Sequence, residues 1–479
     1  MDTSARPGPV ATTGSVAEAP SKHVQGGSYG LRREALSPME TLAQSISTIA
    51  PTATPVATIP LVCALAGNGT WLAYVLATGA VLLVAWCVGR FARYSSSPGS
   101  LYSYASMILP PWLGATAAWS LLLAYIGTGA SVLGGFYHYA NIMLRSATGH
   151  TASAVLLSTL VTAISMWITW RDVKISARLM LWTEAVSVSL IIIVVALVQI
   201  RHGIHPDPEQ IHLRGMTGSG LRLGLVLALF SFVGFESATT LGAEARDPLK
   251  TIPRAVIQSS LLGGLFFAVC AYTEVLGFRM AGQDLATTTD APLHVLARVG
   301  RLPLLGFLID VGALVSLFAG MLACITAAAR VLLLMSHNGL THSSLRSTHA
   351  RNETPTGAIV VTGLATLLPV AILAARGASG LDVYGWLGSL ATYGFIVTYG
   401  LVCFALPRYL RDHHGIVNAA TKTIPGLAFT AMVLALIANL YPVPEGPYGK
   451  LPYIFLAYLA AVLLWFVFSS RTRPVARED

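Results

Sequence analysis

The sequence of 479 residues has few charged side chains and no cysteine motif. Charged residues make up 11% of it, whereas soluble domains carry roughly a quarter. This scarcity, together with 54% hydrophobic residues, excludes an ordinary soluble protein and indicates a chain surrounded mostly by lipid. The five cysteines lie in apolar stretches without CxxC or Cys/His spacing, so we interpret them as small core residues. We expect no metal site and no cofactor.

Signals for other classes of protein are also lacking. The net charge of +9 comes from basic residues between apolar segments, without interleaved aromatics, so we expect no nucleic-acid partner. The chain has no HExxH, GxSxG or phosphate-loop motif and is not predicted to be an enzyme. Residues 1–38 are rich in small and polar residues and have no hydrophobic run, which predicts a disordered tail and no secretory signal.

The sequence does contain a series of apolar stretches, many near the roughly 20 residues that a helix needs to cross the hydrocarbon core. Lipid offers no partner to an open sheet edge, so the predicted fold class is an all-α membrane protein of about twelve transmembrane helices. The predicted crossings are 39–66, 70–92, 111–141, 152–170, 174–200, 222–245, 253–278, 303–335, 355–374, 383–406, 424–441 and 451–469. They form a transporter domain at 39–470, with two groups of five at 39–200 and 222–406, two added helices at 424–469, and a cytoplasmic tail at 471–479.

Basic residues are distributed unevenly between the two sides of the membrane. With the N-terminus in the cytoplasm, about two thirds of the 30 Lys and Arg residues fall on the inner side. Positive loops stay inside, so we expect a multi-pass protein of the cell membrane with both termini in the cytoplasm.

Two predicted crossings at corresponding places in the two groups are interrupted. In the first, residues 48–55 contain two prolines, which remove backbone donors at membrane depth. In the sixth, residues 231–237 contain Gly234 and the ionisable Glu236. A single proline is often only a kink, but paired breaks in two halves of a chain are typical of the central binding site of a secondary transporter.

The segment at the second break resembles a known family. FSFVGFESA at 230–238, GAEARDP at 242–248 and TIPRA at 251–255 resemble the sixth-helix signature of the amino acid–polyamine–organocation permeases. Weaker resemblances to other segments of that family lie at 91–93, 97–104, 327–330 and 338–340. Together the resemblance covers roughly residues 36–470.

The resemblance implies a 5+5 inverted repeat with discontinuous helices 1 and 6, followed by two C-terminal helices. It also implies secondary transport of an amino acid or related amine by alternating access. Half-helix N-termini suit a carboxylate, and freed carbonyls suit an ammonium. Carried over to this chain, the substrate site comprises Ile49, Ala50, Thr52, Ala53, Phe230, Phe232, Val233, Gly234 and Glu236, with Tyr125 as a further candidate. Phe230 either forms an aromatic lid or faces lipid or core. Where many relatives have a glycine-rich first break, this chain has Pro51, which cannot donate a hydrogen bond.

Four acidic residues inside predicted crossings each need a reason, because charge in lipid is costly. Glu236 lies beside the second break, where it either contacts a positive substrate group and couples a proton or merely holds the unwound helix. Glu184 lies near mid-bilayer and either couples a proton or hydrogen-bonds another helix. Glu274 and Asp310 fall near the outer ends of their crossings and are expected to reach water.

The coupling ion is predicted to be a proton, with sodium as the alternative. In some relatives a lysine in helix five takes the place of a sodium ion, and Ser187 stands at the matching position here. Its hydroxyl and that of Thr326 are candidates to line a sodium site, although hydroxyls in membrane helices more often bond a carbonyl or another helix. Two functional alternatives stay open: an exchanger of polyamines or cationic amino acids, and a sensor that keeps the fold without transport.

Overall fold

The computed structural model describes residues 29–203, 205–287, 291–441 and 446–470. Over these ranges the chain is a bundle of helices without a strand, and one isolated parallel bridge joins Leu36 to Ala245. The all-α fold class is therefore confirmed. The α-helices are α1 (Pro38–Ile49), α2 (Ile59–Ala66), α3 (Thr70–Ala92), α4 (Ser100–Ser106), α5 (Pro111–Thr148), α6 (Ala154–Arg171), α7 (Val173–His202), α8 (Pro208–Ile211), α9 (Gly218–Phe230), α10 (Pro248–Met280), α11 (Pro292–Val299), α12 (Pro303–His337), α13 (Thr356–Ala375), α14 (Gly380–His414), α15 (Ala419–Leu440) and α16 (Leu451–Ser470). Shorter π or 3-10 turns are η1 (Thr54–Thr58), η2 (Gly67–Gly69), η3 (Ser237–Leu241), η4 (Leu285–Thr287), η5 (Ser343–Arg346) and η6 (Gly446–Lys450).

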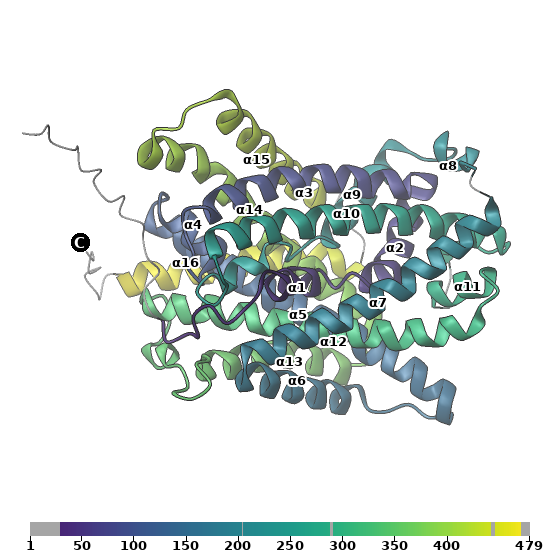
Figure 1. Ribbon diagram of the computed structural model, residues 1–479, viewed down its shortest axis with the longest axis horizontal. Coiled ribbons are helices and arrows are strands. Elements are labelled where there is room, and N and C mark those ends of the chain that lie inside the picture. The colour runs from purple at the N-terminus through teal and green to yellow at the C-terminus, as the bar shows by residue number, and fades with distance from the viewer. Residues whose placement is uncertain (1–28, 204, 288–290, 442–445, 471–479) are drawn as a thin grey trace, which may run out of the picture.

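The described chain contains 10 stretches that are long and apolar enough to cross a membrane. The first, Pro38–Ala92, joins the first two predicted crossings. The sixth predicted crossing contains α9 and the short η3, and α9 is too short to qualify alone. These two places explain the difference from the twelve predicted crossings. The chain is a multi-pass membrane protein whose long helices run along the long axis of the molecule (Figure 1).

Several helices extend beyond the predicted crossings. α5 ends at Thr148 and α14 at His414, whereas the predicted crossings stop at 141 and 406. Each helix is followed by a glycine in the left-handed conformation, Gly149 with φ 76° and Gly415 with φ 61°. A left-handed residue ends a helix, but hydropathy follows only the part inside the hydrocarbon, so polar last turns are missed.

α5 and α14 pack along each other at the centre of the bundle. At Gly394 of α14 a Cβ would lie 2.4 Å from the carbonyl oxygen of Ser120 on α5, and at Gly134 of α5 it would lie 3.0 Å from that of Gly380. Only glycine permits backbones to approach so closely, and such small-residue contacts associate helices in lipid. The two helices therefore hold the side chains that they share at a fixed separation.

The chain is ordered before the first predicted crossing. The Leu36 N–H donates to the Glu244 carbonyl at 3.0 Å, and the Arg246 N–H donates to the Leu36 carbonyl at 3.0 Å. Leu36 is fully buried, and Ser37 and Glu40 form a capping box at the start of α1. Residues 29–37 thus pack against the bundle because their backbone has partners there, although the tail was predicted for 1–38. Residues 1–28 and the tail at 471–479 lie outside the described residues.

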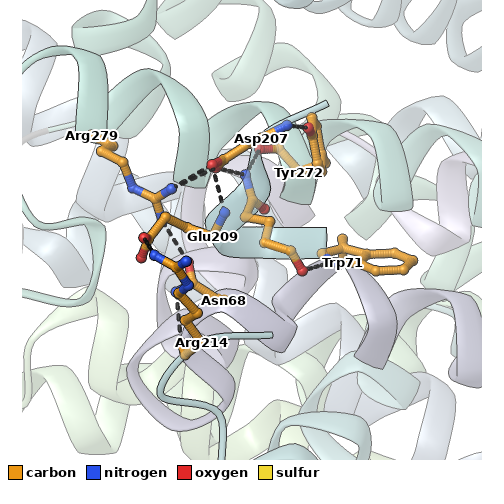
Figure 2. Close-up of polar contacts among 8 residues, drawn as sticks. Asn68, Trp71, Asp207, Glu209, Arg214, Tyr272 and Arg279 are labelled. Atoms are coloured by element: carbon orange, nitrogen blue, oxygen red, sulfur yellow. Dashed lines mark hydrogen bonds and ion pairs between the residues drawn. The ribbon is translucent and has the colours of Figure 1, made fainter. Parts of the chain in front are cut away.

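A polar cluster joins three segments at the opposite end of the bundle (Figure 2). Arg279, at the end of α10, donates to both carboxylate oxygens of Asp207 at 2.7 and 2.6 Å, and it also donates to Asn68 at 2.5 Å. Arg214 donates to Glu209 at 2.7 Å. The remaining members are Trp71, Gln210 and Tyr272. Asp207 is almost fully buried, so the segment between α7 and α9 is fixed to the turn before α3 and to α10.

Candidate functional site

The first break lies between α1 and η1. Ala50 ends α1 in the left-handed conformation, with φ 49° and ψ 67°, and its N–H donates to Ser47 at 3.1 Å. The chain resumes as the π-turn η1 before α2 begins. Among the described residues, the Thr52 N–H has no backbone acceptor and the buried Thr52 hydroxyl has no partner. The break thus provides a donor and a hydroxyl group that the protein itself does not use.

The second break lies between α9 and η3. Tight turns replace the helix here: the N–H groups of Phe232 and Val233 donate to Leu229 and Phe230 at 3.1 and 3.2 Å. Gly234 has φ 90°, a conformation that favours glycine. These two N–H groups are therefore already paired, and the groups that the segment still offers are the second lone pairs of its carbonyls.

The second break packs directly against the last turns of α1, where the first break begins. The Thr48 hydroxyl lies 2.7 Å from that of Ser237, and Ser237 donates to the Gln44 carbonyl at 3.1 Å. The Ala238 N–H donates to the Ser45 hydroxyl at 2.9 Å. A Cβ at Gly234 would lie 2.2 Å from Cγ2 of Thr48. The second break therefore lies beside the end of α1, and glycine is required where it meets Thr48.

Glu236 is the acid at the centre of this arrangement. It is fully buried, and its carboxylate accepts hydrogen bonds from Tyr125 on α5 at 2.8 Å and from Tyr399 on α14 at 2.5 Å. The Tyr399 hydroxyl also accepts the Gly234 N–H at 3.3 Å. The second break is thereby tied to both central helices through one carboxylate and two hydroxyls.

Phe230 is the last residue of α9 and directly precedes the second break. Its ring packs edge-to-face on Tyr384 of α14 with centroids 5.7 Å apart, and a Cβ at Gly388 would lie 2.2 Å from its ring. The Tyr384 hydroxyl lies 3.1 Å from that of Thr58 in η1. Phe230 is half-buried against α14, so it does not simply face lipid.

A family model described as amino acid permease matches residues 40–471. The chain belongs to the amino acid permease family. The branched-chain amino acid permease BcaP of Lactococcus lactis is 28% identical to this permease over 367 residues, 71% of this chain and 77% of that protein. The low-affinity putrescine importer PlaP of Escherichia coli K12 is 25% identical over 319 residues, 62% of this chain and 66% of that protein.

A solved structure shares the fold of this permease. MhsT in complex with L-phenylalanine has a TM-score of 0.55 and 14% sequence identity, covering 85% of this chain and 99% of that chain. Together with the observed breaks after α1 and α9, this likeness confirms the predicted architecture with discontinuous first and sixth helices.

Of the residues predicted to couple an ion, two lie on α7, and Glu184 lines one cavity together with Ile49 and Pro51 of the first break. Glu184 is buried and accepts from the Ser316 hydroxyl of α12 at 3.0 Å with each of its oxygens. Ser187 donates to the Gly312 carbonyl at 2.9 Å. Thr326 is on α12 as well, but fourteen residues beyond Gly312, or about 21 Å along the helix. The hydroxyls of Ser187 and Thr326 therefore do not line one sodium site.

The expectation that Glu274 and Asp310 reach water is wrong. Glu274 is 0% exposed and neither of its carboxylate oxygens has a partner among the described residues, while Asp310 is 7% exposed. His294 of α11 lies 3.0 Å from one oxygen of Asp310. The segment between α10 and α12 folds back onto the bundle as η4 and α11, with Leu293 fully buried, and so covers the ends of these helices.

The permease also has a buried ion pair that no role was predicted for. Arg330 of α12 donates to both carboxylate oxygens of Glu244, at 2.8 Å for one of them, and to the Thr326 carbonyl at 2.9 Å. Both side chains of the pair are 0% exposed. Nearby, Ser100 of α4 hydrogen-bonds Thr239 of η3. These contacts hold the segment after the second break against α12 and α4.

Tyr399, Thr48 and Ser237 also belong to the site, although sequence reasoning did not select them. One signal was present: a tyrosine hydroxyl inside an apolar helix must find a partner, and Tyr384 and Tyr399 are both inside one predicted crossing. Nothing in the sequence indicated that the partner of Tyr399 would be Glu236.

Proposed function

We propose that this permease is a secondary active transporter that carries an amino acid or a related amine across the cell membrane by alternating access, coupled to a proton. The observation that carries the proposal is the direct packing of two interrupted helices against each other, with the buried acid Glu236 in the second break. Polar backbone at membrane depth occurs only where it is enclosed by protein or lines a cavity, and paired breaks of this kind form transporter sites.

In this proposal the substrate's carboxylate is held at the first break. The unused N–H and hydroxyl of Thr52 are the donors there, next to the peptide groups of Ile49, Ala50 and Ala53. Thr52 supplies these donors although Pro51 cannot. The first break has no glycine, and Ala50 takes the left-handed conformation there instead.

The substrate's ammonium group is held at the second break. The ammonium group is expected to contact backbone carbonyls of this segment, because its N–H groups are already paired. These carbonyls belong to Phe230, Phe232, Val233 and Gly234. Glu236 supplies negative charge, Tyr125 orients that carboxylate, and Phe230 is the lid over the substrate.

A second candidate function is exchange of polyamines or cationic amino acids. The observation in its favour is Glu236 itself, since a buried carboxylate beside the site suits a second positive group on the substrate. The relative PlaP is named as a putrescine importer, and putrescine is a polyamine, which supports the same candidate.

The proposed proton carriers are Glu236 and Glu184. Each is a buried carboxyl group bonded to hydroxyls, and no cation is paired with either among the described residues. An uncompensated charge in a bilayer is costly, so a proton or a cationic ligand must accompany each acid. Ser187 fixes α7 against α12 close to Glu184.

We further propose that both termini are cytoplasmic and that the repeats span 39–200 and 222–406, with added helices at 424–469. The described N-terminal residues and the end of α16 lie at one end of the bundle, which agrees with this topology (Figure 1). The excess of basic residues predicted for that side supports a cytoplasmic orientation.

Substrate binding is tested on purified protein by a thermal-shift screen against the twenty amino acids and common polyamines, followed by counterflow in proteoliposomes. A ligand stabilises the state that it binds, and a transported ligand must also exchange across the vesicle membrane. Stabilisation without exchange identifies a sensor and refutes transport, whereas stabilisation by diamines alone favours the second candidate.

Proton coupling is tested in the same vesicles by imposing a pH gradient or a sodium gradient. Glu236→Gln and Glu184→Gln are each expected to abolish uptake driven by the pH gradient. Glu353→Gln, at an exposed position, is the matched control and should leave uptake unchanged. Uptake that follows the sodium gradient and ignores the pH gradient would refute the coupling.

A further inference from the structure

A cleft of about 450 Å³ opens between the end of α14 and the beginning of α15. α15 lies at the edge of the bundle, where it packs on α14 and α3 (Figure 1). Three basic residues line the cleft: Arg408 and Arg411 near the end of α14, and Lys422 in the first turn of α15. The cleft therefore gathers positive charge from two helices.

The positive charge in the cleft is only partly neutralised. Asp412 accepts from Nε of Arg411 at 2.8 Å and from Nε of Arg408 at 3.4 Å. These contacts use one nitrogen of each guanidinium group, so the outward-facing donors of both arginines stay available. In the described part of the chain, Lys422 has no ion-pair partner. Three cations therefore face one carboxylate.

His413 and His414 follow these arginines at the end of α14, but neither lines the cleft. The His413 ring lies 4.8 Å from that of Tyr409, and the His414 ring lies 3.8 Å from that of Tyr94. Both histidines contact tyrosines of the bundle, and the basic residues in the lining of the cleft are the two arginines and the lysine.

The inner wall of the cleft is apolar and opens to the bilayer. Phe404, one turn before Arg408 on α14, is 59% exposed, and Phe429 of α15 is 37% exposed. Their ring centroids lie 5.7 Å apart. Both rings lie inside predicted crossings, where their surroundings are hydrocarbon. One continuous cleft thus leads from exposed rings in the membrane to cations at its boundary.

We propose that this cleft binds an anionic phospholipid. Its phosphate group lies against Arg408, Arg411 and Lys422, and one acyl chain lies along Phe404 and Phe429. Arginine pairs and lysine are suited to phosphate, and basic pockets between helices at the cytoplasmic boundary are suited to anionic headgroups. A soluble anion would use only the basic half of the cleft, whereas a phospholipid uses both halves.

The experiment measures retention of phosphatidylglycerol by purified protein in native mass spectrometry and in nanodiscs of phosphatidylcholine with added phosphatidylglycerol. The triple variant Arg408→Gln, Arg411→Gln, Lys422→Gln is expected to bind phosphatidylglycerol about 100-fold more weakly, from about a fivefold loss per basic residue. The control triple, Lys250→Gln, Arg93→Gln, Arg351→Gln, removes equal charge at exposed positions of the same face and should bind as the wild type does.

Three results would overturn the proposal. The first is equal retention of phosphatidylglycerol by wild type and the cleft triple. The second is an equal loss in the two triples, which means only general attraction to negative membranes. The third is stabilisation of the wild type by glycerol phosphate as strong as that by phosphatidylglycerol, which identifies a soluble anion as ligand. Thermal midpoints in pure phosphatidylcholine verify folding, and Lys422→Glu alone replaces the triple should that variant not fold.

Discussion

Removal of one partner from the buried pair of Arg330 and Glu244 should destabilise the protein more than removal of both. The pair is 0% exposed on both sides and is joined by two hydrogen bonds. Arg330→Met leaves the Glu244 carboxylate buried without a counter-ion, and such uncompensated charges cost about 3–5 kcal/mol. A loss of that size raises the equilibrium constant for unfolding by roughly two to three and a half powers of ten.

The double variant Arg330→Met, Glu244→Leu removes both charges and keeps the volume. Buried ion pairs replaced by apolar residues are often neutral or stabilising, so the double variant should recover most of the loss. The assay is thermal unfolding of purified protein in one detergent, where the single variant should melt on the order of 3–5 °C below the wild type. The exposed Arg351→Met is the matched control and should change stability by at most about 0.5 kcal/mol.

The reasoning fails if Arg330→Met melts with the wild type, because the pair would then carry no buried charge that needs compensation. It also fails if the double variant is no more stable than the single variant, since the loss would then come from packing. A double variant that melts above Arg330→Met supports the uncompensated charge as the cause of the loss.

Other expected outcomes test the breaks and the two ends of the bundle. Gly234→Ala should abolish the folded, monodisperse protein in size-exclusion chromatography, because its Cβ would lie 2.2 Å from a threonine methyl group at a φ of 90°, whereas Gly79→Ala, with open space around it, should be tolerated. Tyr399→Phe should lower the rate of uptake at least about tenfold at unchanged expression, because a hydrogen bond to a buried charged group contributes about 1.5–3 kcal/mol; unchanged uptake contradicts the role of Glu236. Asp207→Asn should lower the melting temperature, since the carboxylate accepts two bonds from one guanidinium group; an unchanged midpoint contradicts it.

The fold could be predicted well because its main signal is one-dimensional. Apolar length gives the crossings, and proline or glycine with an acid gives the breaks at residues 48–55 and 231–237, both of which the structure contains. The ends of α5 and α14 were missed because helices continue past the hydrocarbon into polar sequence. Hydropathy reports the solvent around a helix and not its hydrogen bonds.

The candidate site was harder to predict because partners come from distant parts of the chain. Position along a crossing suggested that Glu274 reaches water, but the packed bundle leaves it 0% exposed. The sequence also gave no means to pair Glu236 with Tyr399, which is 163 residues away. Individual residues of the site were visible, whereas their contacts depend on how helices pack.

The attachment of Glu236 has a consequence for motion. Its two hydroxyl partners stand on α5 and α14, whose backbones touch where a glycine of one meets a carbonyl of the other, so those helices must travel as a unit. If the segment that bears the acid swings relative to that unit, both donors are lost in the same event. A single carboxyl group would thus register which way the protein faces, and its need for a proton would change with that orientation.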